Sequence, residues 1–340
     1  MLNRGGFYLG DGEVTVGEAV EIPPGPGEVT IEVSHVGICG TDLHVIHGTM
    51  DHRVTLPQLI GHEMSGAIVE LGEGVVGFGV GENVVVRPLV SCEQCPACLA
   101  GHNHICQRLS FLGIDAPGAM QDRWTVPAGL VHRVPSSVRL DMAALVEPLA
   151  VACHDVRRGA IEGGESVVVF GAGPIGLLIA LLAKHKGCRV LITDVNTSRL
   201  DFAAELGLDI SSPSQLESDV ARRDGEKGAE VVFEVSGSSS AMAQATGLLR
   251  TRGRLVVVGI HSEPHEVDLF RVFWRELELI GARVYEPVDF DEAIALIADD
   301  SIPVGRLVSS VIPLSDVADA FALLNSGNGV KILVDLNLGR

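Results

Sequence analysis

The sequence is poor in aromatic residues and in positive charge. Phe, Trp and Tyr make up 4% of the 340 residues, and 25 Lys and Arg face 44 Asp and Glu, which gives a net charge of −19. A surface this acidic repels phosphate backbones and anionic lipids, so neither a nucleic-acid partner nor a membrane partner is expected. No apolar run reaches the roughly 18 residues that a membrane-spanning helix needs. Residues 1–10 lack the apolar segment of a signal peptide, so we expect a cytoplasmic protein.

The chain is too long for one ordinary compact core, so two domains are expected. Hydrophobic residues make up 46% of it, and its 40 glycines suit tight turns and close packing of helices on sheets. Residues 1 to about 150 contain short apolar segments separated by Gly and Pro. Residues 28–33, for example, alternate polar and apolar side chains after a turn at 23–27. This pattern predicts a β-rich, partly barrel-like region.

From residue 165 to about 284 the sequence alternates strands with helices. Residues 166–170 form a nearly continuous apolar run, which is typical of a strand buried on both faces. Further strands are expected at 190–193, 231–235, 255–260 and 278–282, and helices at 174–186 and 197–206. This alternation predicts a doubly wound parallel sheet.

Several other segments have helical patterns. We expect a helix over 141–159 that bends at Pro148, a short helix within 211–228, and helices at 291–298 and 315–324. A final strand at 330–334 is expected to fold back on the first domain.

A glycine motif follows the first strand of the alternating region directly. Gly171, Gly173 and Gly176 form the pattern G-x-G-x-x-G, with Pro174 and Ile175 opening the predicted helix. The first glycine permits a tight turn, the second lets a pyrophosphate approach the backbone, and the third lets the helix lie close to the strand. The free N–H groups of the helix N-terminus favour phosphate. The motif therefore predicts a dinucleotide site.

An acidic residue ends the second predicted strand of that region. Asp194 lies 18 residues after Gly176, where a carboxylate can accept hydrogen bonds from the adenosine ribose and would repel a 2′-phosphate. This position favours NAD over NADP. Arg199 is close in sequence, and it could cover the adenine or weaken that preference.

Four of the seven cysteines lie close together in one loop. Cys92, Cys95, Cys98 and Cys106 supply four thiols, which suits a closed tetrahedral zinc site with a structural role. His102 and His104 lie within the loop and could compete as ligands. Cys153 and Cys188 are interpreted as small buried hydrophobic residues.

Two further motifs contain metal-binding side chains. One spans residues 37–44 (Gly-Ile-Cys-Gly-Thr-Asp-Leu-His), and the other spans residues 61–63 (Gly-His-Glu). A catalytic zinc needs a few protein ligands and one open position, which Cys39, His62 and a carboxylate would meet. Neither motif is decisive alone, because a single Cys or His often packs in a core.

Together and in this order, these motifs resemble the medium-chain, zinc-dependent alcohol dehydrogenase family over nearly the whole chain. The segment 146–149 (Val-Glu-Pro-Leu) is more similar to the sorbitol/polyol, threonine and butanediol dehydrogenase branch. The resemblance implies a GroES-like β-rich catalytic domain at 1–151 with a structural zinc lobe at 90–107. It further implies an NAD-binding Rossmann domain at 152–288 and a returning segment at 289–340.

The resemblance also implies roles at the catalytic zinc. Cys39 and His62 correspond to direct ligands, and Glu147 to a third ligand that binds directly or through water. Glu63 corresponds to a carboxylate beside the zinc that can replace water, and it is the rival of Glu147. Asp42 corresponds to the residue that orients His62.

A proton relay is implied by the same motif: Thr41 and His44 correspond to residues that carry the alcohol proton away by way of the nicotinamide ribose. The expected reaction transfers a hydride from a secondary alcohol to NAD and gives a ketone. Two zinc ions per chain are expected, one catalytic and one structural.

The substrate is not readable from the sequence, and a polyol, sugar alcohol, vicinal diol or 3-hydroxy amino acid would each fit the branch. Arg283 and Tyr285 follow the last strand, where some relatives place substrate contacts. Pairing of subunits through 278–282 would give a homodimer or homotetramer. An alternative hypothesis is a zinc-stabilised nucleotide-binding protein without turnover.

Overall fold

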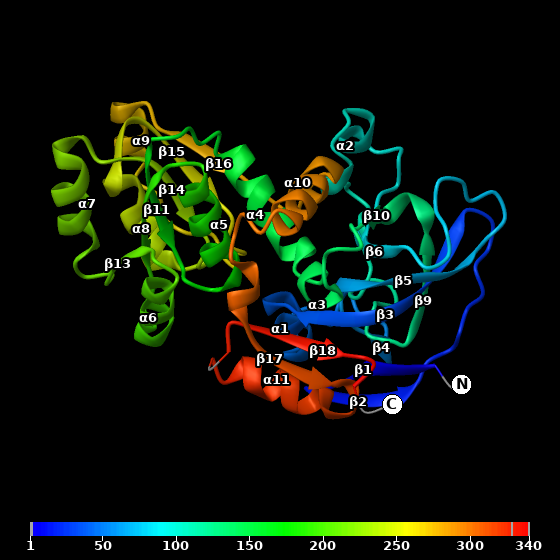
Figure 1. Cartoon of the computed structure of the whole chain (residues 1–340). Helices are drawn as coiled ribbons and strands as arrows, with labels where there is room; N and C mark the ends of the chain where they lie inside the picture. The colour runs from blue at the N-terminus through cyan, green and yellow to red at the C-terminus, as the bar shows by residue number, and fades with distance from the viewer. Residues whose placement is uncertain (1–2, 328, 339–340) are drawn as a thin grey trace. The chain divides into compact units, whose positions relative to one another are not determined.

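Strands from both ends of the sequence share one sheet. In the computed structural model, which describes residues 3–327 and 329–338, β3 (Glu28–Ile38) pairs antiparallel with β5 (Glu63–Leu71) and β18 (Lys331–Asp335). β18 also pairs parallel with β17 (Val308–Pro313), a strand that sequence patterning did not predict. Exposed and half-buried residues dominate β17, so its apolar signal is weak. The terminal strand thereby becomes part of the sheet built by the first 150 residues (Figure 1).

The seven strands of this sheet follow the order β10-β6-β5-β3-β18-β17, with β9 also paired to β3. The remaining members are β6 (Asn83–Val86), β9 (Arg123–Pro127) and β10 (Val131–Arg133). The glycine-containing segments 72–74 and 79–81 lie between β5 and β6. A second sheet has the order β2-β1-β4, with β1 (Arg4–Gly10), β2 (Glu13–Glu18) and β4 (Gln58–Leu59). The apolar residues Val29, Ile31 and Val33 of β3 are buried, but Thr30 and Ser34 on the opposite face are buried as well, so β3 is covered on both faces rather than on one.

Several helices belong to the same unit as these sheets. They are α1 (Gly40–Ile46), α2 (Pro96–Leu99), α3 (Leu140–Ala143), α10 (Pro287–Ala298) and α11 (Val317–Asn325). The paired strands β7 (Leu89–Val90) and β8 (Ser110–Phe111) flank the cysteine loop and close its base.

A six-stranded parallel sheet forms the centre of the other unit, with the order β13-β12-β11-β14-β15-β16 (Figure 1). Its strands are β11 (Ser166–Phe170), β12 (Arg189–Thr193), β13 (Asp209–Ser211), β14 (Ala229–Glu234), β15 (Leu249–Val257) and β16 (Glu278–Gly281). This order, 3-2-1-4-5-6 by position in the chain, is that of a doubly wound dinucleotide-binding fold. The predicted sheet is therefore confirmed. β15 begins earlier than predicted because a register shift lets Leu249 pair with Ala229.

The helices that cover this sheet are α5 (Pro174–His185), α6 (Thr197–Glu205), α7 (Leu216–Asp224), α8 (Ser239–Leu248) and α9 (Leu269–Arg275). α7 is the short helix expected within 211–228. The expected bend at Pro148 was wrong, because α3 ends at Ala143 and α4 (Val146–Arg158) begins anew. Pro148 is the third residue of α4, where its missing N–H leaves no hydrogen bond unmade.

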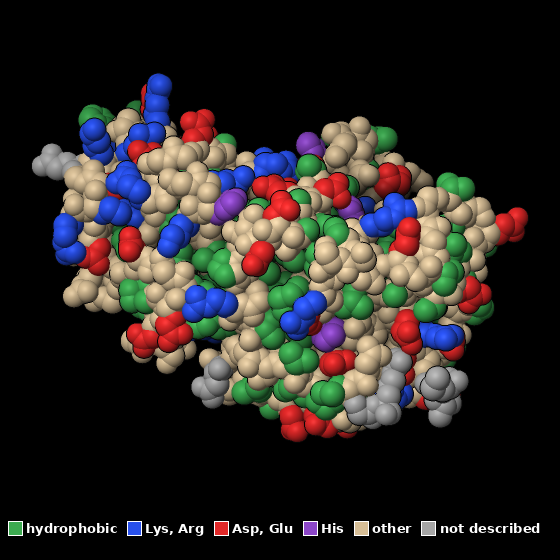
Figure 2. Space-filling view, viewed as in Figure 1, with side chains coloured by type: hydrophobic (Ala, Val, Ile, Leu, Met, Phe, Trp, Pro, Cys, Tyr) green, Lys and Arg blue, Asp and Glu red, His purple; other side chains and the backbone are tan. Residues whose placement is uncertain are grey.

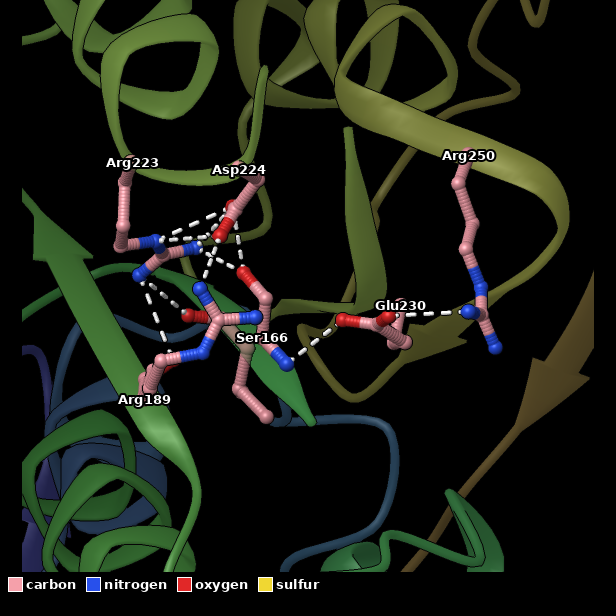
Figure 3. A network of polar contacts seen from close by, with 7 residues as sticks. Ser166, Arg189, Arg223, Asp224, Glu230 and Arg250 are labelled. Carbon is pink, nitrogen blue, oxygen red and sulfur yellow. Dashed lines mark hydrogen bonds and ion pairs between the residues drawn. The ribbon is translucent and has the colours of Figure 1, made fainter. Parts of the chain in front are cut away.

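A network of ion pairs lies at the amino edge of the parallel sheet (Figure 3). The carboxylate of Asp224, at the end of α7, accepts hydrogen bonds from Arg223 and from the hydroxyl of Ser166, and it pairs with Arg189 at 2.9 Å. Glu230 accepts a hydrogen bond from the backbone N–H of Ser166 at 2.6 Å. These contacts tie α7 to the start of β11, at the edge opposite the glycine motif.

Contacts divide the chain into two compact units: Met1–Glu147 with Glu286–Arg340, and Pro148–Tyr285. The sequence placed the domain boundaries at 151/152 and 288/289, and the assignment of functional domains remains a prediction. Within the described ranges, no helix combines the length and apolar character needed to span a bilayer. On the face shown in Figure 2, Lys and Arg side chains lie among Asp and Glu side chains.

Candidate functional site

The start of α1 brings two predicted residues together. Cys39 is the N-cap of the helix, and its backbone N–H donates to Oδ2 of Asp42 at 2.9 Å. The other oxygen of Asp42 lies 3.4 Å from Nδ1 of His62, the residue that immediately precedes β5. Asp42 and His62 are both buried. Asp42 thus holds the backbone of Cys39 and turns Nδ1 of His62 toward itself, which leaves Nε2 available to a metal ion.

The electrostatics of His62 favour a positive charge at this point. Burial lowers the pKa of His62, but the carboxylate of Asp42 and the side chain of Cys39 outweigh burial and raise it well above the ordinary value. A cation bound between Cys39 and His62 would supply the charge that a proton otherwise supplies. The donor set of thiol, imidazole and carboxylate fits zinc.

Glu63 completes a group of three possible ligands with Cys39 and His62. Their ligand atoms all lie within 4.8 Å of one another, a spacing that one zinc ion with bonds of about 2.0–2.3 Å can bridge with little side-chain movement. Among the described residues, Glu147 is not part of this group. It lies buried in the first turn of α4, and its charge helps to raise the pKa of Lys331. Its role as third ligand therefore remains a prediction.

Lys331 is a residue of the site that sequence reasoning missed. Its ammonium group donates to both carboxylate oxygens of Glu63, at 2.7 Å each, and to the carbonyl of Ile38 at 3.1 Å. Burial lowers the pKa of Lys331, but the negative charge of Glu63 outweighs it and raises the pKa above the usual value. The available signal was a lysine opening the otherwise apolar strand β18, because lysine is rarely buried without a partner.

A glycine in β3 leaves the space that the ion pair of Glu63 and Lys331 occupies. Gly37 of β3 lies opposite Glu63 of β5, and a Cβ at Gly37 would come within 2.1 Å of Oε2 of Glu63. Only glycine therefore lets the carboxylate lie flat against β3. The next strand, β18, lies on the other side of β3 and delivers Lys331.

An aromatic ring borders the same group. Phe111 of β8 stands edge-on to the ring of His62, with centroids 5.1 Å apart and planes at 88°. Phe111 is buried, and the sequence offered no signal for its position beyond its being one of ten phenylalanines. The ring limits the directions in which His62 can turn.

The two relay residues lie on α1. Thr41 is half-buried and His44 is exposed, and a separation of three residues places them on one side of the helix. An exposed imidazole can exchange a proton with water, as the end of a relay must. The relay itself remains a prediction.

The four cysteines of the loop converge. Sγ of Cys95 lies 3.5 Å from Sγ of Cys98 and 3.8 Å from Sγ of Cys106. Tetrahedral zinc with bonds of about 2.3 Å to sulfur would place the sulfurs about 3.8 Å apart, so the cluster fits that ion. His102 and His104, the alternative ligands, are not members of this cluster, and His104 lies 3.7 Å from Glu286 instead.

Backbone N–H groups point at these sulfurs. The N–H groups of Cys92 and Arg108 each donate to Sγ of Cys106 at 3.3 Å. Hydrogen bonds led by the backbone N–H of Gln94 lower the pKa of Cys92 to about 6. Donors of this kind stabilise thiolates, the form that binds metal.

The glycine turn after β11 has the shape a dinucleotide requires. Gly171 has a φ of +104°, and a Cβ at Gly176 would come within 1.8 Å of the carbonyl oxygen of Gly171. Gly173 is the N-cap of α5, and a Cβ there would meet nothing within 4 Å. That open space above free N–H groups fits a pyrophosphate. Pro174 and Ile175 open α5, as predicted.

Asp194 follows β12 and joins this turn. Its Oδ2 accepts a hydrogen bond from the N–H of Ala172 at 2.7 Å, and its Oδ1 accepts one from the N–H of Asn196 at 2.8 Å. Arg199 lies 3.9 Å from Oδ2. The carboxylate therefore braces the glycine turn, a task that the sequence did not reveal, and its predicted contact with ribose remains a prediction.

Comparison with known protein families identifies the family to which the chain belongs. The family model for the alcohol dehydrogenase GroES-like domain matches residues 25–136, and the model for zinc-binding dehydrogenases matches residues 174–299. The chain belongs to the zinc-binding alcohol dehydrogenase family. The resemblance inferred from its motifs and the GroES-like plus Rossmann fold class are thus confirmed.

Three relatives of this dehydrogenase cover nearly all of it. A 2-dehydro-3-deoxy-L-galactonate 5-dehydrogenase of Pseudoalteromonas atlantica is 52% identical over 97% of this chain and 98% of that protein. A sorbitol dehydrogenase of Halalkalibacterium halodurans is 34% identical over 96% of each chain. A crystal structure of an Escherichia coli CFT073 short chain alcohol dehydrogenase with NADH has a TM-score of 0.92 at 29% identity, covering 99% of this chain and 100% of that one.

This dehydrogenase is therefore an enzyme of the polyol branch that uses zinc and NAD. It acts on small-molecule alcohols, transferring a hydride from a secondary alcohol to NAD and giving a ketone. The alternative of a nucleotide-binding protein without turnover is not favoured, because the relatives named above are dehydrogenases.

Proposed function

We propose that this dehydrogenase oxidises a secondary hydroxyl of a sugar acid. The substrate class comes from the 52% identical relative, whose name describes oxidation at carbon 5 of a 2-dehydro-3-deoxy sugar acid. The observation that carries the chemistry is the buried group of Cys39, His62 and Glu63.

Each residue of this group has a separate role in the proposed reaction. Zinc held by Cys39, His62 and a carboxylate, Glu63 or Glu147, would lower the pKa of a coordinated hydroxyl. Asp42 keeps the ring of His62 oriented through Nδ1, at 3.4 Å. Glu63, held by Lys331, supplies a fixed negative charge beside the other two ligands.

Proton and hydride leave by different routes. We assign the proton to Thr41 and then to the exposed His44, which releases it to water. The turn at 171–176 would hold the pyrophosphate of NAD, which would supply the hydride acceptor. Asp194, whose oxygens already accept from the N–H groups of Ala172 and Asn196, would accept hydrogen bonds from the adenosine ribose through its remaining lone pairs, which would favour NAD over NADP, and Arg199 would flank the adenine.

A substrate panel tests the proposed class. The enzyme is mixed with NAD and with 2-dehydro-3-deoxy-L-galactonate, L-galactonate, sorbitol, 2,3-butanediol or L-threonine, and the absorbance of NADH is followed. We expect kcat/KM for a sugar acid to exceed that for sorbitol by about tenfold or more, because a polar substrate group left unmatched is strongly selected against. Turnover of sorbitol but not of sugar acids would contradict the substrate class. Silence with every compound, with NADH still bound, would contradict the enzymatic role.

We propose further that the enzyme is a homodimer or a homotetramer of such dimers. β16 is an edge strand of the parallel sheet, and α9, which precedes it in the chain, exposes Leu269, Phe270, Phe273 and Trp274, each at least two-thirds accessible. The rings of Phe270 and Trp274 stack at 5.8 Å. An open strand edge and a cluster of exposed large apolar side chains are each typical of a subunit interface.

Sedimentation should reveal this interface. We expect the wild-type enzyme to sediment as a dimer or tetramer, and Trp274→Glu to shift it toward the monomer, because a charge would be buried in the contact. Val76→Glu, at an exposed apolar residue of the other unit, is the matched control and should leave the mass unchanged. A monomeric wild-type protein at micromolar concentration would refute the proposal.

The cysteines support a cytoplasmic location. All seven lie in the described part of the chain and none forms a disulfide, and four must stay reduced to hold zinc. A reducing compartment keeps such thiols available, whereas an oxidising one favours disulfides.

A further inference from the structure

A buried carboxylate that the mechanism above does not use lies at the end of β14. Glu234 is fully buried, and its Oε1 accepts hydrogen bonds from the N–H of Ser236 at 2.9 Å and from the Ser236 hydroxyl at 2.5 Å. Its Oε2 lies 3.0 Å from Nε2 of His261. A buried carboxylate is costly without partners, and Nε2 of His261 is the polar group that faces it on the Oε2 side.

The side chain of His261 is mostly buried, but the hydrogen-bonding capacity of its ring nitrogens is not fully satisfied. Its side chain is 16% exposed and packs edge-on against the ring of His265, with centroids 4.9 Å apart. Oε2 of Glu234 and both ring nitrogens of His261 are buried, yet none completes an aligned hydrogen bond within the described structure. Native proteins rarely leave buried polar atoms in this state unless a ligand or water satisfies them.

The pair lies at the carboxyl edge of the parallel sheet, together with the glycine turn. A Cβ at Gly171 would come within 3.2 Å of the N–H nitrogen of Ser236, so the turn after β11 contacts the turn after β14. A Cβ at Gly237 would come within 2.7 Å of the carbonyl oxygen of Ile260, the residue before His261. The three turns after β11, β14 and β15 are therefore packed side by side.

Strand order assigns this region to one half of the cofactor. In a sheet of order 3-2-1-4-5-6 each half binds one mononucleotide, and the dinucleotide lies across the carboxyl edge. Asp194 follows β12 directly and belongs to the adenosine half. Glu234 ends β14, and His261 follows β15, so both belong to the half that receives the nicotinamide riboside.

We propose that His261, held by Glu234, binds the nicotinamide riboside half of NAD. Because Nε2 faces the carboxylate of Glu234 at 3.0 Å, the tautomer with its proton on Nε2 fits this geometry and leaves Nδ1 as a hydrogen-bond acceptor. Its partner on the cofactor is then a neutral donor, a ribose hydroxyl or the carboxamide N–H. Phosphate oxygens, which only accept, do not match. Glu234 is a positioning residue that acts through His261.

Binding measurements on the zinc-loaded enzyme test this inference. Dissociation constants for AMP, ADP-ribose and NADH are measured by calorimetry for wild type, His261→Ala and Glu234→Gln. We expect NADH to bind about tenfold more weakly to His261→Ala, the loss of roughly one hydrogen bond, and AMP to bind unchanged. Glu234→Gln should shift NADH in the same direction. Weaker ADP-ribose binding would identify the ribose as the partner, and unchanged ADP-ribose binding would identify the carboxamide.

His265→Ala is the matched control, because it removes the neighbouring ring and leaves Glu234 and His261 in place. Equal weakening of AMP and NADH, or unchanged NADH binding in the two variants, would overturn the inference. If His261→Ala fails to fold, Glu234→Gln, which keeps the shape of the side chain, decides the matter. The inference rests on NAD and not on the sugar acid. A wild type that binds NADH but oxidises no sugar acid would overturn only the proposed substrate.

Discussion

Replacing Cys39 by serine should lower kcat/KM by about 10³-fold or more and leave the fold intact. A metal that stabilises transition-state charge contributes several kcal/mol, and each 1.4 kcal/mol corresponds to about a factor of ten. Cys39 lies at the N-cap of α1, half-buried, and serine can occupy this helix position. Metal analysis should find two zinc ions per wild-type chain and one in Cys39→Ser.

Cys95→Ser provides the contrast. Cys95 belongs to the four-sulfur cluster, far in sequence from the group at Cys39, and its loss should release the other zinc and lower the thermal stability first. A single zinc per wild-type chain would contradict the assignment of two sites. If both variants lost activity, stability and metal alike, the division into a catalytic and a structural site would be wrong.

Replacing Lys331 by methionine should destabilise the protein by about 3–5 kcal/mol, because it leaves the buried carboxylate of Glu63 without its partner. Both side chains are almost completely buried, at 3% and 0% exposure, so solvent does not screen the pair. The change is measured as the difference in free energy of unfolding in urea. Activity should fall as well, since Glu63 lies within 4.8 Å of the ligand atoms of Cys39 and His62.

A double variant separates the charge from the packing. Lys331→Met combined with Glu63→Gln removes both charges and should recover part of the lost stability, and comparison with Glu63→Gln alone completes the cycle that gives the coupling of the pair. Lys227→Met, at an exposed lysine, is the control and should change stability by less than about 0.5 kcal/mol. Equal stability of Lys331→Met and wild type would show that Glu63 does not depend on Lys331.

Several elements of the fold were predictable because the residues that form them are adjacent in the sequence. The strand 166–170, the glycine turn that follows it and the helix from Pro174 are adjacent in sequence and adjacent in space. The apolar strands of the parallel sheet were recognisable because both of their faces are buried. β17 was missed because its pattern of exposed and half-buried residues carries little apolar signal. Pro148 was misjudged because its effect depends on where α4 begins.

The sequence by itself determined the two sites whose parts are close in the chain. The cysteines from Cys92 to Cys106 form one short loop, and the residues at 171–176 form a single turn, so spacing alone defines their chemistry. Only the tertiary structure decided the third group. Glu63 and Lys331 are 268 residues apart, and they meet because β5 and β18 pair with opposite sides of β3. Strand pairing of this kind depends on the register of the whole sheet, which no local pattern encodes.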